Sequence, residues 1–469
     1  MEIISDMNIE KSSDKQEFGK KQKWSFGLGS FGQWFINSAF NTWVFSFYFS
    51  AIGLSVSYIV LAYVLWTFWN AFNDPFIGFL SDRTNTRFGR RKPYILIGTI
   101  PILILEIILW LPPVNNQIIT FIYLLIMLVC YDIFYTMVAL PYDSLFPELY
   151  TSVEERAEVN TIKQILATLG MLLAFIVPGI FIGDIAIRDG YLLNGIVTTT
   201  LVGISLLISL IWGVKEREEF KLDHQQRFGF FEGLKYAMKN KGFVLYTIMF
   251  FLYEYILLEL ATVVPLFGKH VLGVDAFATS LMLGVMFLVG IITVVLWNRL
   301  DLYFGSRKAY AIAIVVYFIA SLPMLIVDSY FNAIIVSVFM GIGFGGMLYF
   351  IYLIIADVID EDELRTGVRR EGTYFGVTNF FMRLAMVLSI LTVGLVFSST
   401  GWEEYDPLPG VNVILGLRFL VVVFPGIALG VTLLCLYYYP FTKERVQEIK
   451  EELEELHKNK LDRVRSSND

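Results

Sequence analysis

The chain has 469 residues, of which 56% are hydrophobic and only 17% are charged, with a formal net charge of −7. Soluble domains carry about 25% charged residues, so this chain lacks the polar side chains to cover two or three of them. The composition therefore excludes a soluble protein and predicts an all-α integral membrane protein. No basic tract with interleaved aromatic residues indicates a nucleic-acid partner.

Residues 1–23 are polar and contain no apolar core, so we expect a cytoplasmic N-terminal tail rather than a cleavable signal peptide. Twelve apolar segments follow, each long enough to cross a bilayer as a helix. Helices are required because isolated strands would leave backbone groups unpaired in lipid. The predicted spans are residues 24–51, 56–81, 93–112, 117–146, 158–183, 191–213, 243–270, 276–299, 308–328, 331–358, 372–399 and 412–440.

A longer polar segment, residues 214–242, divides these spans into two sets of six. We expect an N-terminal six-helix bundle at 24–213, a central cytoplasmic linker at 214–242, a C-terminal six-helix bundle at 243–440 and a cytoplasmic tail at 441–469. The loops at 87–94 and 303–310 have related sequences, and each precedes the third span of its half. Such internal repeats indicate a transporter with a substrate site between the two halves.

Basic residues fix the expected orientation. They gather in the loops at 83–92, 299–308 and 365–370 and next to both termini, whereas the other side carries only Arg188 and Lys269. Because basic loops stay in the cytoplasm, both termini are predicted to be cytoplasmic and the protein to lie in the cell membrane.

Charged residues at the cytoplasmic ends of the spans are candidates for a gate. Salt bridges among them would close that side in one state, and simple solvation explains them equally well. The candidate gate residues are Arg83, Arg87, Arg90, Arg91, Glu155, Arg156, Asp357, Asp360 and Arg370.

Asp74 is the first candidate for coupling, because a charge inside the membrane costs at least about 2.5–3.5 kcal/mol and needs a reason. Asn70 lies one helical turn earlier on the same face, Asn73 is adjacent, and Pro75 frees a backbone carbonyl. These oxygens could hold a small cation. The alternatives are that Asp74 accepts a proton or pairs structurally with an arginine.

Two further charges belong to this hypothesis. Asp143 follows Pro141, where we expect the helix to break, and is either a second coupling acid or a salt-bridge partner. Arg383 lies halfway along the span at 372–399, where a buried cation needs an anion or a polar ligand. It could be the counter-charge of Asp74, or it could pair permanently with Glu254.

Candidates for substrate binding are polar or aromatic residues within the spans, since sugar rings stack on aromatic faces and their hydroxyls bond to polar side chains. Packing is the alternative for each aromatic residue. The glycine-rich run 341–346 is either a hinge or a site of close helix packing. The candidate substrate residues are Trp34, Asp132, Lys163, Gln164, Glu254, Tyr349 and Arg383.

Three passages resemble a known family. They are Asn73–Gly78 with Arg87–Pro93, then Leu140–Leu145, and then Ala356–Asp360 with Thr366–Gly372. The chain resembles the glycoside–pentoside–hexuronide:cation symporters of the major facilitator superfamily, of the melibiose-permease type. The resemblance implies twelve helices in two bundles, alternating access, and sugar uptake driven by a sodium or proton gradient.

The family's motif residues carry over unevenly. Asp74, Asn73 and Thr136 match residues of the family's cation site, but Asn70 and Ala139 stand where the family has acids. An arginine, Arg383, replaces the family's lysine. At the implied sugar site, Trp34 replaces an acid, and Gln164, next to Lys163, replaces an arginine. These departures favour a proton over sodium as the coupling ion.

We therefore predict a secondary transporter that couples a proton, or alternatively sodium, to symport of a sugar or glycoside. A monomer in the lipid bilayer is expected, with no cofactor besides the coupling ion. The first alternative is a lipid or amphiphile transporter of the same fold, and a more remote one is a non-transporting membrane receptor. An enzyme is not expected, because no nucleophile–base pair, metal-ligand set or nucleotide loop is found.

Overall fold

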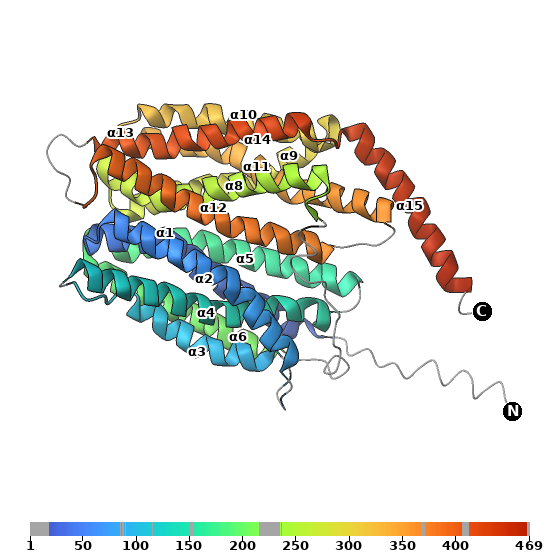
Figure 1. The fold of residues 1–469 in the computed structure, drawn as a ribbon, viewed down its shortest axis with the longest axis horizontal. Helices are drawn as coiled ribbons and strands as arrows, with labels where there is room; N and C mark the ends of the chain where they lie inside the picture. Colours follow the sequence, from blue (N-terminus) through green and yellow to red (C-terminus); the bar gives the residue numbers. More distant parts are fainter. Residues whose placement is uncertain are drawn as a thin grey trace.

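The computed structural model describes residues 18–84, 86, 89, 91–114, 116–150, 153–214, 235, 237–366, 371–405 and 412–466, apart from a few side chains within these ranges. The described chain is almost entirely helical (Figure 1). The N-terminal half contains α1 (Lys20–Ser46) with the π-helical turn η2 (Phe47–Ala51), α2 (Val56–Arg83), α3 (Lys92–Ile108), α4 (Gln117–Leu149), α5 (Val153–Ile182), and α6 (Arg188–Ile208) with η3 (Ser209–Gly213).

The C-terminal half repeats this arrangement and adds one helix at its end. It contains α8 (Lys241–Phe267) with η5 (Gly268–Leu272), α9 (Ala276–Phe304), α10 (Ser306–Ser321) with η6 (Leu322–Leu325), α11 (Tyr330–Thr366), α12 (Glu371–Thr400), α13 (Val413–Arg418) with η7 (Phe419–Val423), α14 (Phe424–Tyr438), and α15 (Lys443–Ser466). Each of the twelve predicted spans coincides with one of these helical segments.

Length and hydropathy identify nine membrane-crossing segments within the described residues, all from α4 onward. The first three helices fall outside that set. α3 has only 17 residues, and α1 carries serine, glycine, glutamine and asparagine side chains along its length. The structure therefore confirms an all-α, multi-pass membrane protein and, by this criterion, nine of the twelve predicted crossings.

The two halves form two helix bundles that lie side by side, the first in blue to green and the second in yellow to red (Figure 1). In the first, α1 packs on α5 and α6, and α4 packs on α2 and α3. In the second, α11 packs on α9 and α10, and α8 packs on α12 and α14. Contacts of α2 with α12, α5 with α9 and α1 with α8 join the bundles.

The end of the bundles from which α15 leaves is named the α15 face. The other end, where α1 connects to α2 and α8 connects to α9, is named the opposite face. Two contacts between the bundles lie in the half nearer the opposite face. Phe175 of α5 stacks on Phe287 of α9, with ring centroids 4.6 Å apart. Gly394 of α12 lies against Val60 near the start of α2.

The internal repeat is visible in the backbone. Gly89, before α3, and Gly305, before α10, both have positive φ angles, of 103° and 81°. Glycine is favoured there because other L-residues rarely adopt this conformation. The related loop sequences at 87–94 and 303–310 therefore place a glycine with positive φ at the same position in each half.

Two expectations about local helix shape have clear outcomes. The predicted break at Pro141 is wrong, because α4 continues from Gln117 to Leu149. The glycine run in α11 lies within an unbroken helix, and Gly341 and Gly345 lie against backbone carbonyl oxygens of α9. Close packing, rather than a break, is what the structure shows for these glycines.

The C-terminal helix α15 is partly covered by the rest of the protein. It contacts α11, and its side chains Ile449 and Leu453 are 1% and 5% exposed. These residues lie four positions apart and so share one face of the helix. One apolar stripe of α15 thus packs on the protein, and acidic residues occupy other positions.

Candidate functional site

A polar cluster joins α2, α4 and α12 at the boundary between the bundles. Asp132 of α4 accepts hydrogen bonds from two amides of α2, those of Asn70 and Asn73; the Asn73 Nδ2 to Asp132 Oδ2 distance is 2.8 Å. Asn73 also contacts Thr136 Oγ1 at 3.1 Å. Asp132 is buried, with 4% of its surface exposed. Its carboxyl group is therefore held by neutral amide donors.

Asp74 occupies the other end of the cluster. The Thr136 hydroxyl donates to Asp74 Oδ1 at 2.9 Å, and the Arg383 guanidinium of α12 forms an ion pair with Asp74 Oδ2. Arg383 also donates to the backbone carbonyl and the side-chain oxygen of Asn70. The predicted counter-charge relation between Arg383 and Asp74 is confirmed. The partners of Arg383 do not include Glu254, which was the alternative.

Helical spacing explains how the cluster forms. Asn73 and Asp74 follow Asn70 by three and four positions on α2, so these three residues share one face of the helix. Asp132 and Thr136 lie four positions apart on α4 and likewise share a face. α2 packs along α4, which brings the two faces together. α12 then places Arg383 from the other bundle against them.

The structure corrects the expectation for Asp132. From the sequence, Asp132 was expected among the substrate residues, and Asp143 was the candidate for a second coupling acid. Asp132 instead lies in the same hydrogen-bond network as Asp74. The missed signal is its spacing of four from Thr136, and the pairing of α2 with α4 is what makes that spacing meaningful.

Asp143 and Lys163, predicted in two different sites, contact each other. Their Oδ1 and Nζ atoms are 3.1 Å apart. The ammonium group of Lys163 also lies over the ring of Phe146, 4.8 Å from its centroid, and near Tyr142. The structure thus shows the salt-bridge role for Asp143. The carboxylate that Lys163 contacts is that of Asp143, which is not part of the Asp74 cluster.

Trp34 lies on α1 with 47% of its surface exposed, although α1 packs against α5, α6 and α8. Asn37 and Asn41 follow it at three and seven positions, are partly exposed, and bond to each other at 3.4 Å. These three residues therefore form one polar and aromatic stripe on α1. Sequence reasoning singled out Trp34 but missed the asparagines, whose spacing from it was the available signal.

The remaining substrate candidates are dispersed. Gln164 is exposed on α5, and Glu254 is buried in α8 with 8% of its surface exposed. The Tyr349 hydroxyl donates to Asp301 Oδ2 at 3.4 Å, near the α15 end of α9. That hydrogen bond places the Tyr349 hydroxyl beside α9, and its role in substrate binding stays a prediction.

The gate residues are only partly described. Glu155 lies 3.6 Å from Lys23 Nζ within the first bundle, Asp357 and Arg91 are 6% and 4% exposed, and Asp360 is partly buried. The side chains of Arg83 and Arg156, and the whole of Arg87, Arg90 and Arg370, lie outside the described residues. The cytoplasmic gate therefore stays a prediction.

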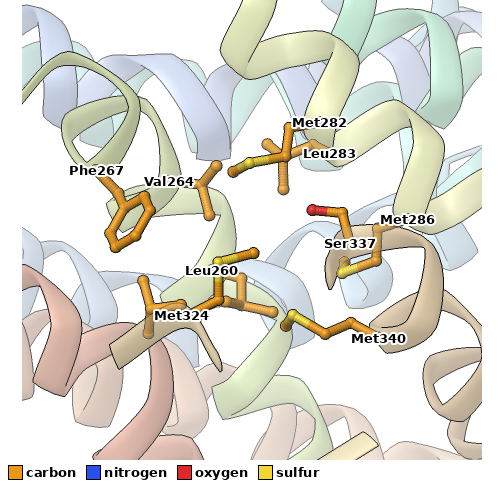
Figure 2. Close-up of a pocket in the computed structure, with 10 residues that line it drawn as sticks. Leu260, Val264, Phe267, Met282, Leu283, Met286, Met324, Ser337 and Met340 are labelled. Carbon is orange, nitrogen blue, oxygen red and sulfur yellow. The ribbon is translucent and has the colours of Figure 1, made fainter. Parts of the chain in front are cut away.

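A separate apolar cavity lies inside the second bundle, where side chains of α8, α9, η6, α11 and η7 meet (Figure 2). Four methionines border it, Met282, Met286, Met324 and Met340, and the single polar side chain is that of Ser337. The Ser337 hydroxyl donates to the carbonyl of Ala333. The cavity lacks the convergent polar groups that orient a sugar, so we do not assign the substrate to it.

Paired bundles with a repeat, and a charged cluster at their boundary, define a secondary transporter of the major facilitator type. The chain belongs to the MFS/sugar transport protein family, whose model matches residues 25–443. The resemblance to glycoside–cation symporters of this superfamily is thereby confirmed.

Named relatives cover nearly the whole chain. An uncharacterised symporter of Synechocystis sp. is 23% identical and covers 96% of this chain and 98% of its own. The isoprimeverose transporter of Lactiplantibacillus pentosus is 22% identical, with 90% and 89% coverage. The sodium-dependent lysophosphatidylcholine symporter 1-A of Danio rerio is 23% identical, with 83% and 80% coverage.

Solved structures share the fold. A D-xylose–proton symporter matches with a TM-score of 0.66 and 13% identity, covering 90% of this chain and 97% of its own. A bacterial homologue of the lysosomal transporter Spinster matches with a TM-score of 0.68 and 16% identity, covering 90% and 98%. These identities support the major facilitator fold and nothing finer.

Proposed function

We propose that this protein is a proton-coupled symporter of a sugar or glycoside that works by alternating access. The observation that carries the proposal is the charge balance of the cluster. Two carboxylates, of Asp74 and Asp132, meet one guanidinium, of Arg383. Two negative charges and one positive charge leave an excess of one negative charge, which a single monovalent cation or proton would neutralise.

The proton is favoured by the orientation of the amides. Because Arg383 donates to the side-chain oxygen of Asn70, the amide nitrogen of Asn70 must face Asp132. Asn73 likewise directs its nitrogen to Asp132. Hard cations need several oxygen ligands, whereas a proton needs one carboxylate oxygen. The two N–H groups beside Asp132 leave too few oxygen ligands there for sodium, which makes a proton the favoured ion.

The cluster can couple ion binding to movement because its parts belong to different bundles. Asp74, Asn70 and Asp132 lie in the first bundle, and Arg383 lies in the second. When the bundles rock apart, Arg383 withdraws from Asp74 and the cluster loses its positive charge. Two carboxylates then share a low-dielectric site, which favours proton uptake. Proton binding and bundle movement thus favour each other.

The substrate is proposed from the stripe on α1 and from a relative. Trp34 offers an aromatic face, and Asn37 and Asn41 offer amide donors and acceptors suited to sugar hydroxyls. The isoprimeverose transporter is a relative along nearly the whole chain. A second candidate is a lysophospholipid or similar amphiphile, which the relative from Danio rerio favours.

Uptake into proteoliposomes tests the proposal. Radiolabelled isoprimeverose, other glycosides and lysophosphatidylcholine would each be offered under an inward proton gradient or an inward sodium gradient. We expect accumulation of a glycoside with the proton gradient alone. Accumulation of lysophosphatidylcholine, or of any substrate with sodium alone, would contradict the proposed substrate or ion respectively.

Asp132→Asn is the matched variant for coupling. It keeps the shape of the side chain but removes the charge and replaces one of the two acceptor oxygens with an N–H donor, so accumulation is expected to fall at least tenfold while exchange of internal for external substrate persists. Full gradient-driven accumulation by this variant would remove Asp132 from the coupling site.

A further inference from the structure

At the opposite face, the loop after α5 crosses to the second bundle. Asp184 in this loop pairs with Lys269 of η5, at the end of α8. The carbonyl of the preceding residue, Gly183, accepts a hydrogen bond of 2.7 Å from the backbone N–H of Ala276, the first residue of α9. One loop of the first bundle is thus tied to two helix ends of the second.

The loop after α12 makes the reverse crossing. The carbonyl of Glu403 accepts a hydrogen bond of 3.0 Å from the backbone N–H of Val56, the first residue of α2. The carboxylate of Glu403 accepts from the hydroxyls of Ser57 and Ser55, at 2.9 and 3.3 Å. Here a loop of the second bundle is tied to the start of a helix in the first.

The internal repeat relates the two crossings. α5 and α12 are the fifth helices of their halves, and a glycine with positive φ follows each: Gly183 at 64° and Gly401 at 81°. The receiving ends also match. α1 and α8 each finish in a π-helical turn followed by a glycine with positive φ, Gly53 at 72° and Gly273 at 66°, three residues before the next helix begins.

Aromatic side chains fill the space next to the second crossing. Phe49 of η2 lies 5.2 Å from Phe397 of α12 and 5.1 Å from Trp402, measured between ring centroids. All three are buried, at 0–1% exposure. Packed rings of both bundles therefore keep water from reaching the midplane between them at this place.

We propose that these crossings are two latches, related by the repeat, that hold the opposite face closed during the transport cycle. One is the ionic latch of Asp184 and Lys269, and the other is the hydroxyl latch of Glu403 with Ser55 and Ser57. Both join residues of different bundles, so opening this face must break them. The inference rests on the proposed alternating access.

The two latches differ in their response to salt. Asp184 and Lys269 have side chains that are 37% and 34% exposed, and exposed charge pairs are screened when the Debye length shortens to about 3 Å at 1 M salt. Neutral hydroxyl donors to Glu403 are less affected. High salt should therefore weaken the ionic latch selectively.

Spin-label distances across the opposite face test the proposal without any substrate. Labels would be placed on the full-length protein in lipid nanodiscs, with Cys130 and Cys435 replaced by serine, at Val114 and Phe331, which are 54% and 71% exposed in different bundles. Lys269→Gln and Glu403→Ala are each expected to increase the population at longer distances. The double variant is expected to increase it most.

Arg188→Gln is the control, because Arg188 lies at the same face but donates to Pro112 within the first bundle. Its distances should equal those of the parent protein. An unchanged distribution in the double variant would overturn the latches. Because distances are measured directly, this result differs from a failure to transport sugar, which would count against the proposed function instead.

Cross-linking gives a second readout. In the same cysteine-free background, Asp184→Cys with Lys269→Cys would be joined by a reducible bifunctional thiol reagent. We expect the joined protein to lose more than nine-tenths of its substrate exchange and to recover it on reduction. Exchange at the unjoined rate while the link is intact would overturn the ionic latch.

Discussion

Arg383 of α12 forms an ion pair with Asp74 of α2 across the boundary between the two bundles. Their side chains are 22% and 27% exposed, so the pair is screened from water on most sides. It is also the link through which the second bundle reaches the acidic cluster of the first. Changes at either residue should therefore affect both stability and coupling.

Asp74→Asn is expected to abolish gradient-driven accumulation while leaving exchange partly intact. The variant removes one of two carboxylates and leaves Arg383 balanced only by Asp132. Uptake against a gradient and equilibrium exchange, measured in the same vesicles, separate the two effects. Unchanged accumulation would remove Asp74 from the coupling mechanism.

Arg383→Lys is expected to behave as a non-conservative change. Arg383 serves three acceptors, the Asp74 carboxylate and both oxygens of Asn70, with a planar fork of donors. A lysine ammonium on a flexible stem cannot keep this arrangement. Charge-assisted hydrogen bonds are worth about 1.5–3 kcal/mol each, so transport should fall at least tenfold.

A double-mutant cycle of Asp74→Asn and Arg383→Gln supplies the control for both variants. The thermal-unfolding free energies of the two single variants and the double variant should reveal a coupling of about 0.5–3 kcal/mol. Additive losses would mean that the ion pair contributes nothing to stability.

The fold and part of the site followed from sequence for physical reasons. Hydropathy marks helices in lipid because backbone groups there must be paired internally, so all twelve ranges coincide with helical segments. The relation of Asp74 to Arg383 followed from charge, since one buried cation needs an anion. These inferences use local sequence or a simple charge balance.

The contacts that depend on how two helices pack against each other were not predicted from the sequence. Asp132 joins Asp74 only because α2 and α4 pack face to face. Lys163 of α5 meets Asp143 of α4 only because the fold brings these two helices together there. The break expected at Pro141 is absent, and α4 continues as one helix to Leu149. Neither register nor tertiary support is encoded in residue spacing on one segment.

Lys163→Met should preserve substrate affinity and reduce stability modestly. Methionine keeps the contact with Phe146 but loses a cation–π interaction, about 0.5–1 kcal/mol, and a partly exposed ion pair of similar or smaller value. Michaelis constants should stay within about threefold. Trp34→Leu is the comparison and should weaken binding at least tenfold; the reverse ranking would return Lys163 to the substrate site.

Acid should destabilise the protein through the latches. Burial opposes ionisation of Asp184, but hydrogen bonds from Ala186 and Lys269 outweigh it and lower its pKa. For Glu403, burial again raises the pKa, but hydrogen bonds from the hydroxyls of Ser398, Ser57 and Ser55 outweigh it and lower the pKa. Each of these carboxyl groups has a lower pKa in the folded protein than in the unfolded chain. Its contribution to stability is therefore complete at a pH above the unfolded pKa, and it is lost as the pH falls through the folded pKa.

The melting temperature, followed by intrinsic fluorescence, should therefore fall as the pH drops below about 4, near and below the ordinary carboxyl values. Asp184→Asn with Glu403→Gln should reduce that fall relative to the parent protein, because two of the titrating groups are gone. Identical pH profiles would show that neither acid titrates differently on unfolding.

Gly345→Ala tests the close packing of α11 on α9. A β-carbon at Gly345 would meet the backbone carbonyl of Gly290 and the hydroxyl of Thr293, and the backbone group cannot move without shifting α9. Overpacking of this kind typically costs about 1–3 kcal/mol, which should appear as a lower melting temperature.

Gly376→Ala on α12 is the matched control, since nothing lies within 4 Å of the added carbon and alanine favours helix by up to about 1 kcal/mol. If both variants were equally stable, the contact between α11 and α9 would have to be looser than the structure shows. If Gly345→Ala kept its stability but lost transport, the glycine would matter for helix movement rather than for packing.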